Sequence, residues 1–249
     1  MNRITLSAAA ALVAAAPAFA ANVTPEVIFG SGNANGDFTV ATGVGGSLEL
    51  GLRGKLRFDS NNQPQNIFNY DGVDTYSFAP GTPPTGFGFA PNSPTTPIWN
   101  FEWSVNTDAN GSGVNLDGGY TYELSLDVDP GAGTNFLTFD PINVASADHA
   151  LGTNATGNGG GISDTANYAT LLSSNNVAQN SWNYEFFNHL PPLDGFNPNT
   201  PGLYTISLTA FDGTAELVST SININVVPTP AAFGAGMIGL LAVATRRGR

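Results

Sequence analysis

Residues 48–58 read Leu-Glu-Leu-Gly-Leu-Arg-Gly-Lys-Leu-Arg-Phe, and they determine the expected fold. In an extended chain the leucines and Phe58 fall on one face, with Gly54 in the same row. The opposite face carries the charged residues Glu49, Arg53, Lys55 and Arg57. A period of two over this length predicts a half-buried strand. The three bases are expected to pair with acidic residues on neighbouring strands.

The same alternation recurs along the chain, in residues 120–129, 203–210 and 221–226. Because Asp212-Gly213 is a turn signal between the last two, residues 203–227 are expected to form a hairpin. Shorter candidate strands are 38–41, 75–78, 99–105, 136–139 and 182–186. Strands with one polar face, separated by Gly, Pro and Asn, predict an all-β fold: an antiparallel β-sandwich of jelly-roll or immunoglobulin-like type.

One short helix is expected after residue 163. Asp164 can cap it, and Tyr168, Leu171 and Leu172 have the spacing of one helical face. We find no linker that divides the interior, so residues 21–226 are expected to form a single domain.

Charge and composition exclude several classes of protein. The chain has 249 residues with 7 basic and 19 acidic side chains, two histidines and no cysteine. Disulfides, zinc fingers and thiol nucleophiles are therefore excluded. Four of the seven bases lie near the termini, so the interior carries 3 − 19 = −16. Nucleic acid is not expected as a partner, because neutralising phosphates requires Lys and Arg.

The N-terminus has the parts of a secretory signal peptide. A basic residue at position 3 precedes an apolar run and the small residues Ala18 and Ala20. We expect cleavage after Ala20, which makes residues 1–20 an export signal. The alternative is a buried N-terminal helix.

The C-terminal residues 227–249 form a second unusual segment. Val227, Pro228, Thr229 and Pro230 precede an apolar run over 231–244, and the chain ends with Arg246, Arg247 and Arg249. The run is short for a membrane-spanning helix, which needs about 20 residues. Trailing arginines would hold its end on the cytoplasmic side. An ordinary single-pass tail anchor is the alternative to a sorting signal.

Val-Pro-x-Pro, a short Gly/Ala/Leu helix and a terminal Arg cluster resemble the PEP-CTERM sorting signal of Gram-negative bacteria. In this chain Thr229 stands where Glu is usual, and Gly248 interrupts the arginines. The resemblance implies Sec export, a transient inner-membrane anchor through 231–244, and recognition near Pro-x-Pro by an exosortase, a membrane cysteine transpeptidase. It implies final delivery to the cell surface or the extracellular matrix, in a setting of exopolysaccharide and biofilm.

The interior also resembles one group of PEP-CTERM proteins of unassigned function. The similar stretches are 35–42, 48–58, 129–136 and 176–183. This resemblance extends over most of residues 30–230 and carries no catalytic residue with it.

Two segments share the pattern Trp-Asn-aromatic-Glu-aromatic, at residues 99–103 and 182–186. On adjacent strands, Glu102 and Glu185 could face each other beside aromatic rings, as the paired carboxylates of a glycosidase do. The alternative is that the rings point into the core and leave Asn100 and Glu102 on the wet face.

A calcium loop is the second candidate site. Asp108, Asn110, Ser112 and Asp117 place oxygen atoms at intervals around glycines, similar to the first half of an EF-hand loop. The closing Glu is missing, because the twelfth position is Gly119. The alternative is that Asn, Asp and Gly are present as turn residues. No other cofactor or metal is expected, and His149 and His189 are interpreted as surface or loop residues.

The sequence therefore favours an exported structural or interaction protein that is not an enzyme. The alternatives are a glycan-binding module, with or without Ca²⁺, and an extracellular glycosidase that would depend on Glu102 and Glu185.

Overall fold

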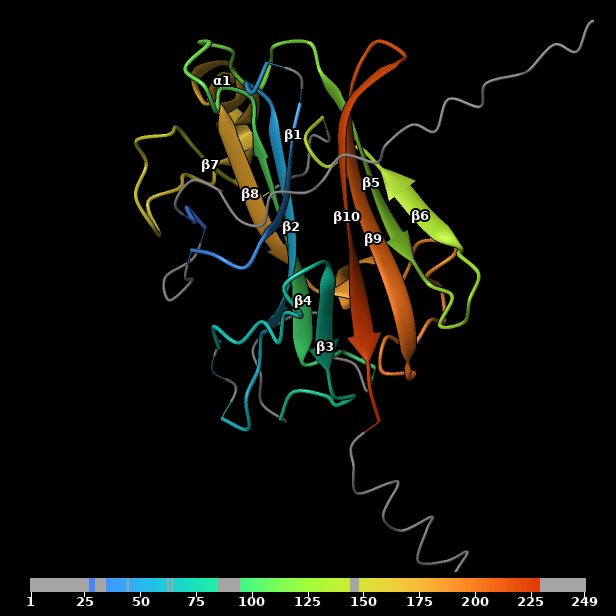
Figure 1. The fold of residues 1–249 in the computed structure, drawn as a ribbon. Coiled ribbons are helices and arrows are strands. Elements are labelled where there is room, and N and C mark those ends of the chain that lie inside the picture. Colours follow the sequence, from blue (N-terminus) through green and yellow to red (C-terminus); the bar gives the residue numbers. More distant parts are fainter. Residues whose placement is uncertain are drawn as a thin grey trace, which may run out of the picture.

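Two β-sheets face each other across one hydrophobic core (Figure 1). This computed structural model describes residues 27–29, 35–43, 45–61, 63, 65–84, 95–143 and 148–228. Within these residues each sheet has five strands, and the single α-helix, α1 (Tyr168–Ser174), lies at one end of them. The prediction of a mainly β fold with largely antiparallel sheets and one short helix is confirmed.

Sheet A has the strand order β1-β2-β4-β8-β7 and is antiparallel throughout. Its strands are β1 (Thr39–Thr42), β2 (Glu49–Leu56), β4 (Trp99–Asn106), β8 (Val177–Trp182) and β7 (Ala150–Gly152). Sheet B has the order β3-β10-β9-β5-β6 and is antiparallel except for the parallel pair β3 and β10. Its strands are β3 (Thr75–Phe78), β10 (Ala215–Val226), β9 (Gly202–Asp212), β5 (Thr121–Asp127) and β6 (Phe136–Phe139).

The predicted hairpin forms the centre of sheet B. β9 and β10 pair antiparallel across a tight turn that includes Gly213, whose φ of 58° favours glycine. Tyr204 and Ile206 of β9 and Ile222 of β10 are fully buried, and they share one hydrophobic cluster with the inward side chains of β2 and β4. The period-two interpretation of residues 203–227 is therefore confirmed.

Most of the shorter strands are also where the sequence predicts them, but residues 182–186 are not a strand. β8 ends at Trp182, and Asn183 caps a 3₁₀ helix, η2 (Tyr184–Phe187), by accepting a hydrogen bond from the amide of Glu185 at 3.1 Å. The strands β7 and β8 were not predicted. In β8 the three consecutive residues from Val177 are all buried, so both of its faces are covered and it shows no alternation.

The expected short helix is confirmed, with a tighter first turn. Asp164 accepts hydrogen bonds from the amides of Ala166 and Asn167, and so caps a 3₁₀ turn, η1 (Thr165–Asn167), that leads into α1. Tyr168 is the buried residue of α1. Within the described part of the chain, no helix has both the length and the apolar character that crossing a bilayer requires.

Gly54 allows the two sheets to approach closely. It lies on the inward face of β2, and a Cβ at this position would be 2.7 Å from Ile224 Cδ1 of β10 and 2.7 Å from Tyr76 Cβ of β3. A third atom, Phe78 Cε2, would be 2.9 Å away. Because all three neighbours belong to sheet B, the backbone of β2 packs directly against the opposite sheet.

We expect Gly54→Ala to lower the free energy of unfolding by about 1–3 kcal/mol, since an added methyl group would force well-packed core residues to shift. Thermal and urea unfolding would measure the change. Gly43→Ala is the matched control, because its Cβ would lie 3.6 Å from its nearest neighbours, an ordinary contact distance. Equal unfolding midpoints for the two variants would contradict this account of the sheet contact.

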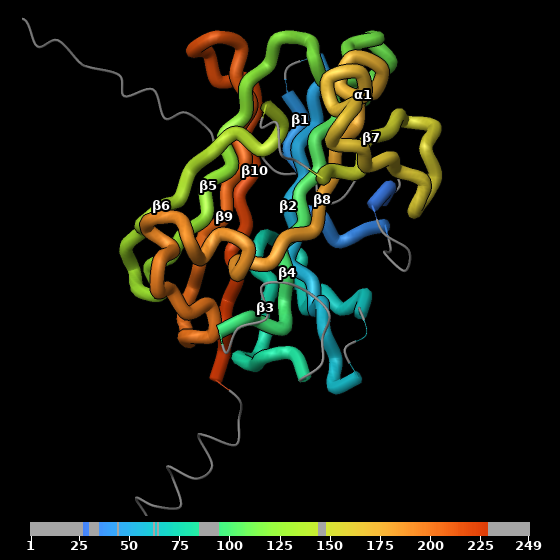
Figure 2. The backbone as a smooth tube through the Cα atoms, turned by 180° about the vertical axis from the view of Figure 1, so that it is seen from behind, coloured from blue at the N-terminus to red at the C-terminus, as the bar shows by residue number. Residues whose placement is uncertain are grey.

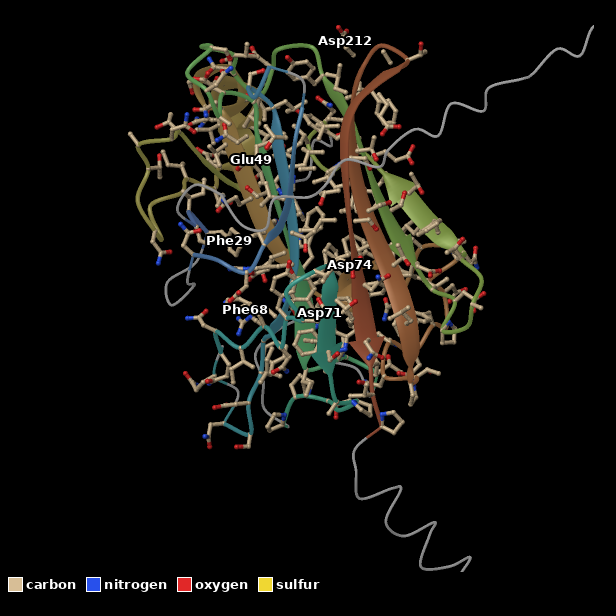
Figure 3. The ribbon with its side chains drawn as sticks, viewed as in Figure 1. Phe29, Glu49, Phe68, Asp71, Asp74 and Asp212 are labelled. Carbon is tan, nitrogen blue, oxygen red and sulfur yellow. The ribbon has the colours of Figure 1, made fainter. Side chains whose placement is uncertain are left out.

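The prediction that β2 has one wet face is wrong. Seven of its eight residues are buried, and all eight residues of β4 are buried. The outward face of sheet A is covered by an additional layer that includes Val27, Phe29 and Phe38. In Figure 3, Phe29 and Phe68 lie on the side of sheet A that faces away from sheet B. The covering residues come from irregular segments, which have no periodic pattern in the sequence.

Candidate functional site

A cluster of charged side chains is buried between sheet A and the layer that covers it. Arg53 and Lys55 project from β2 and Glu102 from the facing strand β4, where Arg53 and Glu102 are paired in register. Arg53 Nε lies 2.5 Å from Glu102 Oε2, and Lys55 Nζ lies 3.6 Å from Glu102 Oε1. The side chains of these three residues are at most 1% exposed. The prediction that the bases of this strand pair with an acid on a neighbouring strand is confirmed for Arg53 and Lys55.

Aromatic rings enclose the guanidinium of Arg53. Its Cζ lies 4.1 Å from the ring centre of Phe38 and 4.5 Å from that of Phe68. Nη1 donates a hydrogen bond to the carbonyl oxygen of Gly36 at 2.7 Å. A cation stacked on rings and paired with a carboxylate compensates part of the cost of its own burial. The cluster therefore attaches the covering segment to sheet A.

The two Trp-Asn-aromatic-Glu-aromatic segments do meet, but through their asparagines. Asn183 Nδ2 donates to Asn100 Oδ1 at 2.9 Å and also to the carbonyl oxygen of Trp99 at 3.1 Å. The expectation that Asn100 and Glu102 face water is wrong, because both are at most 1% exposed. The outward face of sheet A, which carries both side chains, is covered. The alternation of polar and apolar residues in the sequence therefore does not indicate that these two are buried.

Glu185 is also buried, at 2% exposure, and lies in η2 rather than on a strand. Its Oε1 accepts a hydrogen bond from Asn188 Nδ2 at 2.6 Å, and its Oε2 accepts one from Thr95 Oγ1 at 3.2 Å. Glu102 and Glu185 therefore each bind neighbouring side chains of the fold. With both carboxylates enclosed, neither is placed to contact a sugar in this structure.

Glu49 is a buried carboxylate whose environment differs from that of Glu102. It begins β2 on the same outward face and is 7% exposed, and its Oε1 has no hydrogen-bond partner. Burial raises the pKa of Glu49 from 4.5 to about 7. Figure 3 places it along sheet A from Phe29 toward the end that carries α1. The charged form of this side chain is therefore disfavoured in the fold.

His149 lies inside the molecule, so its interpretation as a surface residue is wrong. It is 1% exposed and makes edge contacts with the rings of Trp103 and Tyr168. Asn180 Nδ2 lies 3.1 Å from Nδ1, so Nδ1 accepts and Nε2 donates to the carbonyl oxygen of Pro141. Burial lowers the pKa of His149 to about 4, although the bond to Pro141 opposes this. His189, in contrast, is exposed as expected.

Three of the four residues of the candidate calcium loop, Asp108, Asn110 and Ser112, are hydrogen-bonded within and around the loop. Asp108 Oδ1 accepts from Ser112 Oγ at 3.0 Å and from the amide of Gly113 at 2.7 Å. Asn110 Nδ2 donates to the carbonyl oxygen of Gly45 at 2.7 Å, and Asp117 is exposed. These bonds are those of turn residues. Among the described residues, no three His, Asp or Glu side chains gather in a group that could hold a metal ion.

The described domain ends directly before the predicted sorting motif. β10 ends at Val226, and the amide of Val227 still donates to the carbonyl oxygen of Phe78 at 2.9 Å. Pro228 is the last residue that the structure describes. The other residues predicted to take part in processing lie outside the described residues, as do segments 1–20 and 231–249; they are Ala18, Ala20, Thr229, Pro230 and the three C-terminal arginines.

Seen from the opposite side, α1 and the loops around it close one end of sheet A, and the chain leaves the domain from β10 at the other end (Figure 2). Of the candidate site residues that the structure describes, Glu102 and Glu185 are thus buried with protein partners, and Asp108, Asn110 and Ser112 are hydrogen-bonded in loops. In comparisons with known proteins, no family model, no curated protein and no solved structure matches this chain.

Proposed function

We propose that this chain is an exported β-sandwich protein of the cell surface or extracellular matrix that acts through binding rather than catalysis. In this proposal the Sec pathway exports it and residues 231–244 hold it briefly in the inner membrane. An exosortase then processes it near Val227–Pro230. Its setting is exopolysaccharide and biofilm, as the resemblance to PEP-CTERM proteins implies.

The observation that carries the proposal is that the side chains with catalytic potential are buried and already bound to other groups of the fold. Glu102, Glu185 and His149 are all at most 2% exposed, and each has protein partners. A general acid or base must reach the proton that it transfers. Buried groups with structural partners do not meet that requirement, so we do not propose glycoside hydrolysis.

The position of the last strand supports the sorting part of the proposal. The final backbone hydrogen bond of the folded body is made at Val227, one residue before Pro228. The Pro-x-Pro element therefore begins where the domain ends, as expected of a recognition sequence read in an accessible segment.

Intact-mass analysis of the exported protein tests this proposal. In a bacterium that encodes an exosortase, we expect the mature mass to lack residues 1–20 and the C-terminal apolar run with its arginines. The matched control is the same strain without the exosortase, in which the tail should be retained. A tail that is retained in both strains would identify an ordinary membrane anchor and would contradict the sorting proposal.

Glycan binding without catalysis is the second candidate function. The observation that favours it is the composition of the solvent-facing side of sheet B, which is rich in hydroxyl and amide groups and is described below.

A further inference from the structure

The outward face of sheet B is more exposed along β9 and β10 than the outward face of sheet A. Along β9 and β10, residues that point inward are buried and those that point outward are partly exposed. The outward positions are Leu, Thr, Ser, Thr and Phe over residues 203–211, and Ser, Ser, Asn and Asn over residues 219–225. None of these nine positions is charged. The outward residues of β3, Thr75 and Ser77, extend this composition to the neighbouring strand.

Hydroxyl groups form a row across four strands of this face. Ser221 pairs with Ser207, Ser207 with Ser125, and Ser125 with Thr138. Adjacent strands are about 4.8 Å apart, so the row extends over about 14 Å. Its accessible members are Ser207 and Ser221, which are partly exposed, and Thr138, which is exposed, whereas Ser125 is buried at 4% exposure. Ser125 Oγ and Thr138 Oγ1 are 2.9 Å apart and hydrogen-bonded.

In the two neighbouring rows of this face, side chains on β9 and β10 are also hydrogen-bonded to each other. Thr209 Oγ1 lies 2.8 Å from Ser219 Oγ, and Thr205 Oγ1 donates to Asn223 Oδ1 at 3.2 Å. Short side chains that hold one another lose little conformational freedom when a ligand binds. The face is therefore organised in advance of binding.

The absence of charge from the outward positions of β3, β9 and β10 described above is unusual for this chain. All but one of its 19 acidic residues lie in the described part of the structure, and the solvent-facing side of a sheet is where charged residues are ordinarily placed. Here they lie around those three strands: Glu123 and Asp127 are on the outward side of β5, Asp212 is at the tip of the hairpin, and Asp71 and Asp74 are at the β3 edge (Figure 3). A centre without charge inside a charged border is the composition of a recognition surface.

We propose that the outward face of sheet B binds a neutral polysaccharide chain. Hydroxyl and amide groups both donate and accept hydrogen bonds, which matches the hydroxyls of a sugar. Phe136 and Leu203, at 38% and 44% exposure, supply apolar contacts for the C–H faces of the rings. An interior charge of −16 repels polyanions, so the neutral class is favoured. This inference rests on the matrix role proposed above and assigns it a site.

A second copy of the chain would be the other occupant of such a face. Stable homodimer interfaces have a predominantly apolar centre. The centre of this face consists of Ser207, Ser221 and their hydroxyl neighbours, so it lacks the apolar area that a dimer requires.

The test measures retention of the full chain on three polymers: insoluble cellulose, a neutral galactomannan and the polyuronate alginate. We expect binding to a neutral polymer and not to alginate. Ser207→Lys places a long charged side chain at the centre of the row and should weaken binding at least tenfold. Thr170→Lys, on the exposed side of α1, is the matched control and should bind as the wild type does. If Ser207→Lys does not fold, Thr138→Lys on the exposed edge strand β6 tests the same row.

Each outcome has a distinct meaning. Equal binding by Ser207→Lys and the wild type would overturn the assigned face but leave the matrix role standing. Preference for alginate would overturn the neutral class. Dimers in light scattering that disappear in Ser207→Lys would show that a second copy occupies the face. A wild-type chain that binds none of the three polymers would contradict both this inference and the polysaccharide setting of the proposed function, whereas the sorting proposal has its own mass measurement.

Discussion

Glu102→Gln is expected to destabilise the folded domain by about 3–5 kcal/mol, which is the effect of removing one partner from a buried ion pair. The substitution keeps the shape of the side chain and removes its negative charge. Arg53 and Lys55 would then remain in a site that is at most 1% exposed, without the carboxylate that lies 2.5 Å from Arg53 Nε. Chemical denaturation at neutral pH, with the slope checked for a change in the denatured state, would measure the loss.

The control for Glu102→Gln is Glu216→Gln, because Glu216 is exposed near the hairpin turn. It should change the free energy of unfolding by less than about 0.5 kcal/mol, as surface substitutions usually do. If the two variants were equally stable, the buried cluster would contribute nothing to the attachment of the covering layer. The same result would indicate that Glu102 is accessible to solvent.

The same substitution at Glu49 is expected to have the opposite effect. Glu49→Gln should raise the free energy of unfolding at pH 8 by about 3 kcal/mol, from a pKa change of 4.5 to about 7 at about 1.4 kcal/mol per pKa unit. Glutamine is uncharged, as the protonated acid is, so the cost of burying a carboxylate disappears. In the described part of the chain Glu49 forms no ion pair like those of Glu102 that would compensate that cost, and its Oε1 has no hydrogen-bond partner.

The sign of the pH dependence follows from the raised pKa. Between pH 4.5 and about 7 the folded chain keeps a proton on Glu49 that the unfolded chain has lost. The unfolded state therefore binds fewer protons, and the stability contributed by this site falls as pH rises through that window. At pH 4 the wild type and Glu49→Gln should be equally stable. A difference between wild type and Glu49→Gln that is independent of pH would contradict the assignment of the effect to ionisation.

The strands that could be predicted from the sequence are those with one face in the core. Residues 48–58 and the hairpin over 203–227 alternate because one side of each strand packs between the sheets. β8 could not be predicted in this way, because Val177, Ala178 and Gln179 are all buried and the strand therefore has no polar face.

The environment of the charged residues could be predicted only in part. An acid-rich chain with three bases on one strand predicts their pairing, and Arg53 and Lys55 do pair with Glu102. What the strand pattern could not indicate is the layer above them. Phe38 and Phe68 reach Arg53 from segments whose position depends on tertiary contacts. For the same reason, the sequence predicts His149 at the surface, although its ring packs against Trp103.

The direct connection between β10 and the proposed processing motif limits how the chain could be presented to a membrane enzyme. From Val227, which is still hydrogen-bonded to Phe78, to Pro230 there are three residues, a tether of at most about 10 Å. In an anchored intermediate, the end of the domain at which β3 and β10 end would thus lie close to the bilayer. The strands of sheet B run away from that end. The outward face of sheet B would therefore lie roughly perpendicular to the membrane plane and would be open to polymers between neighbouring molecules.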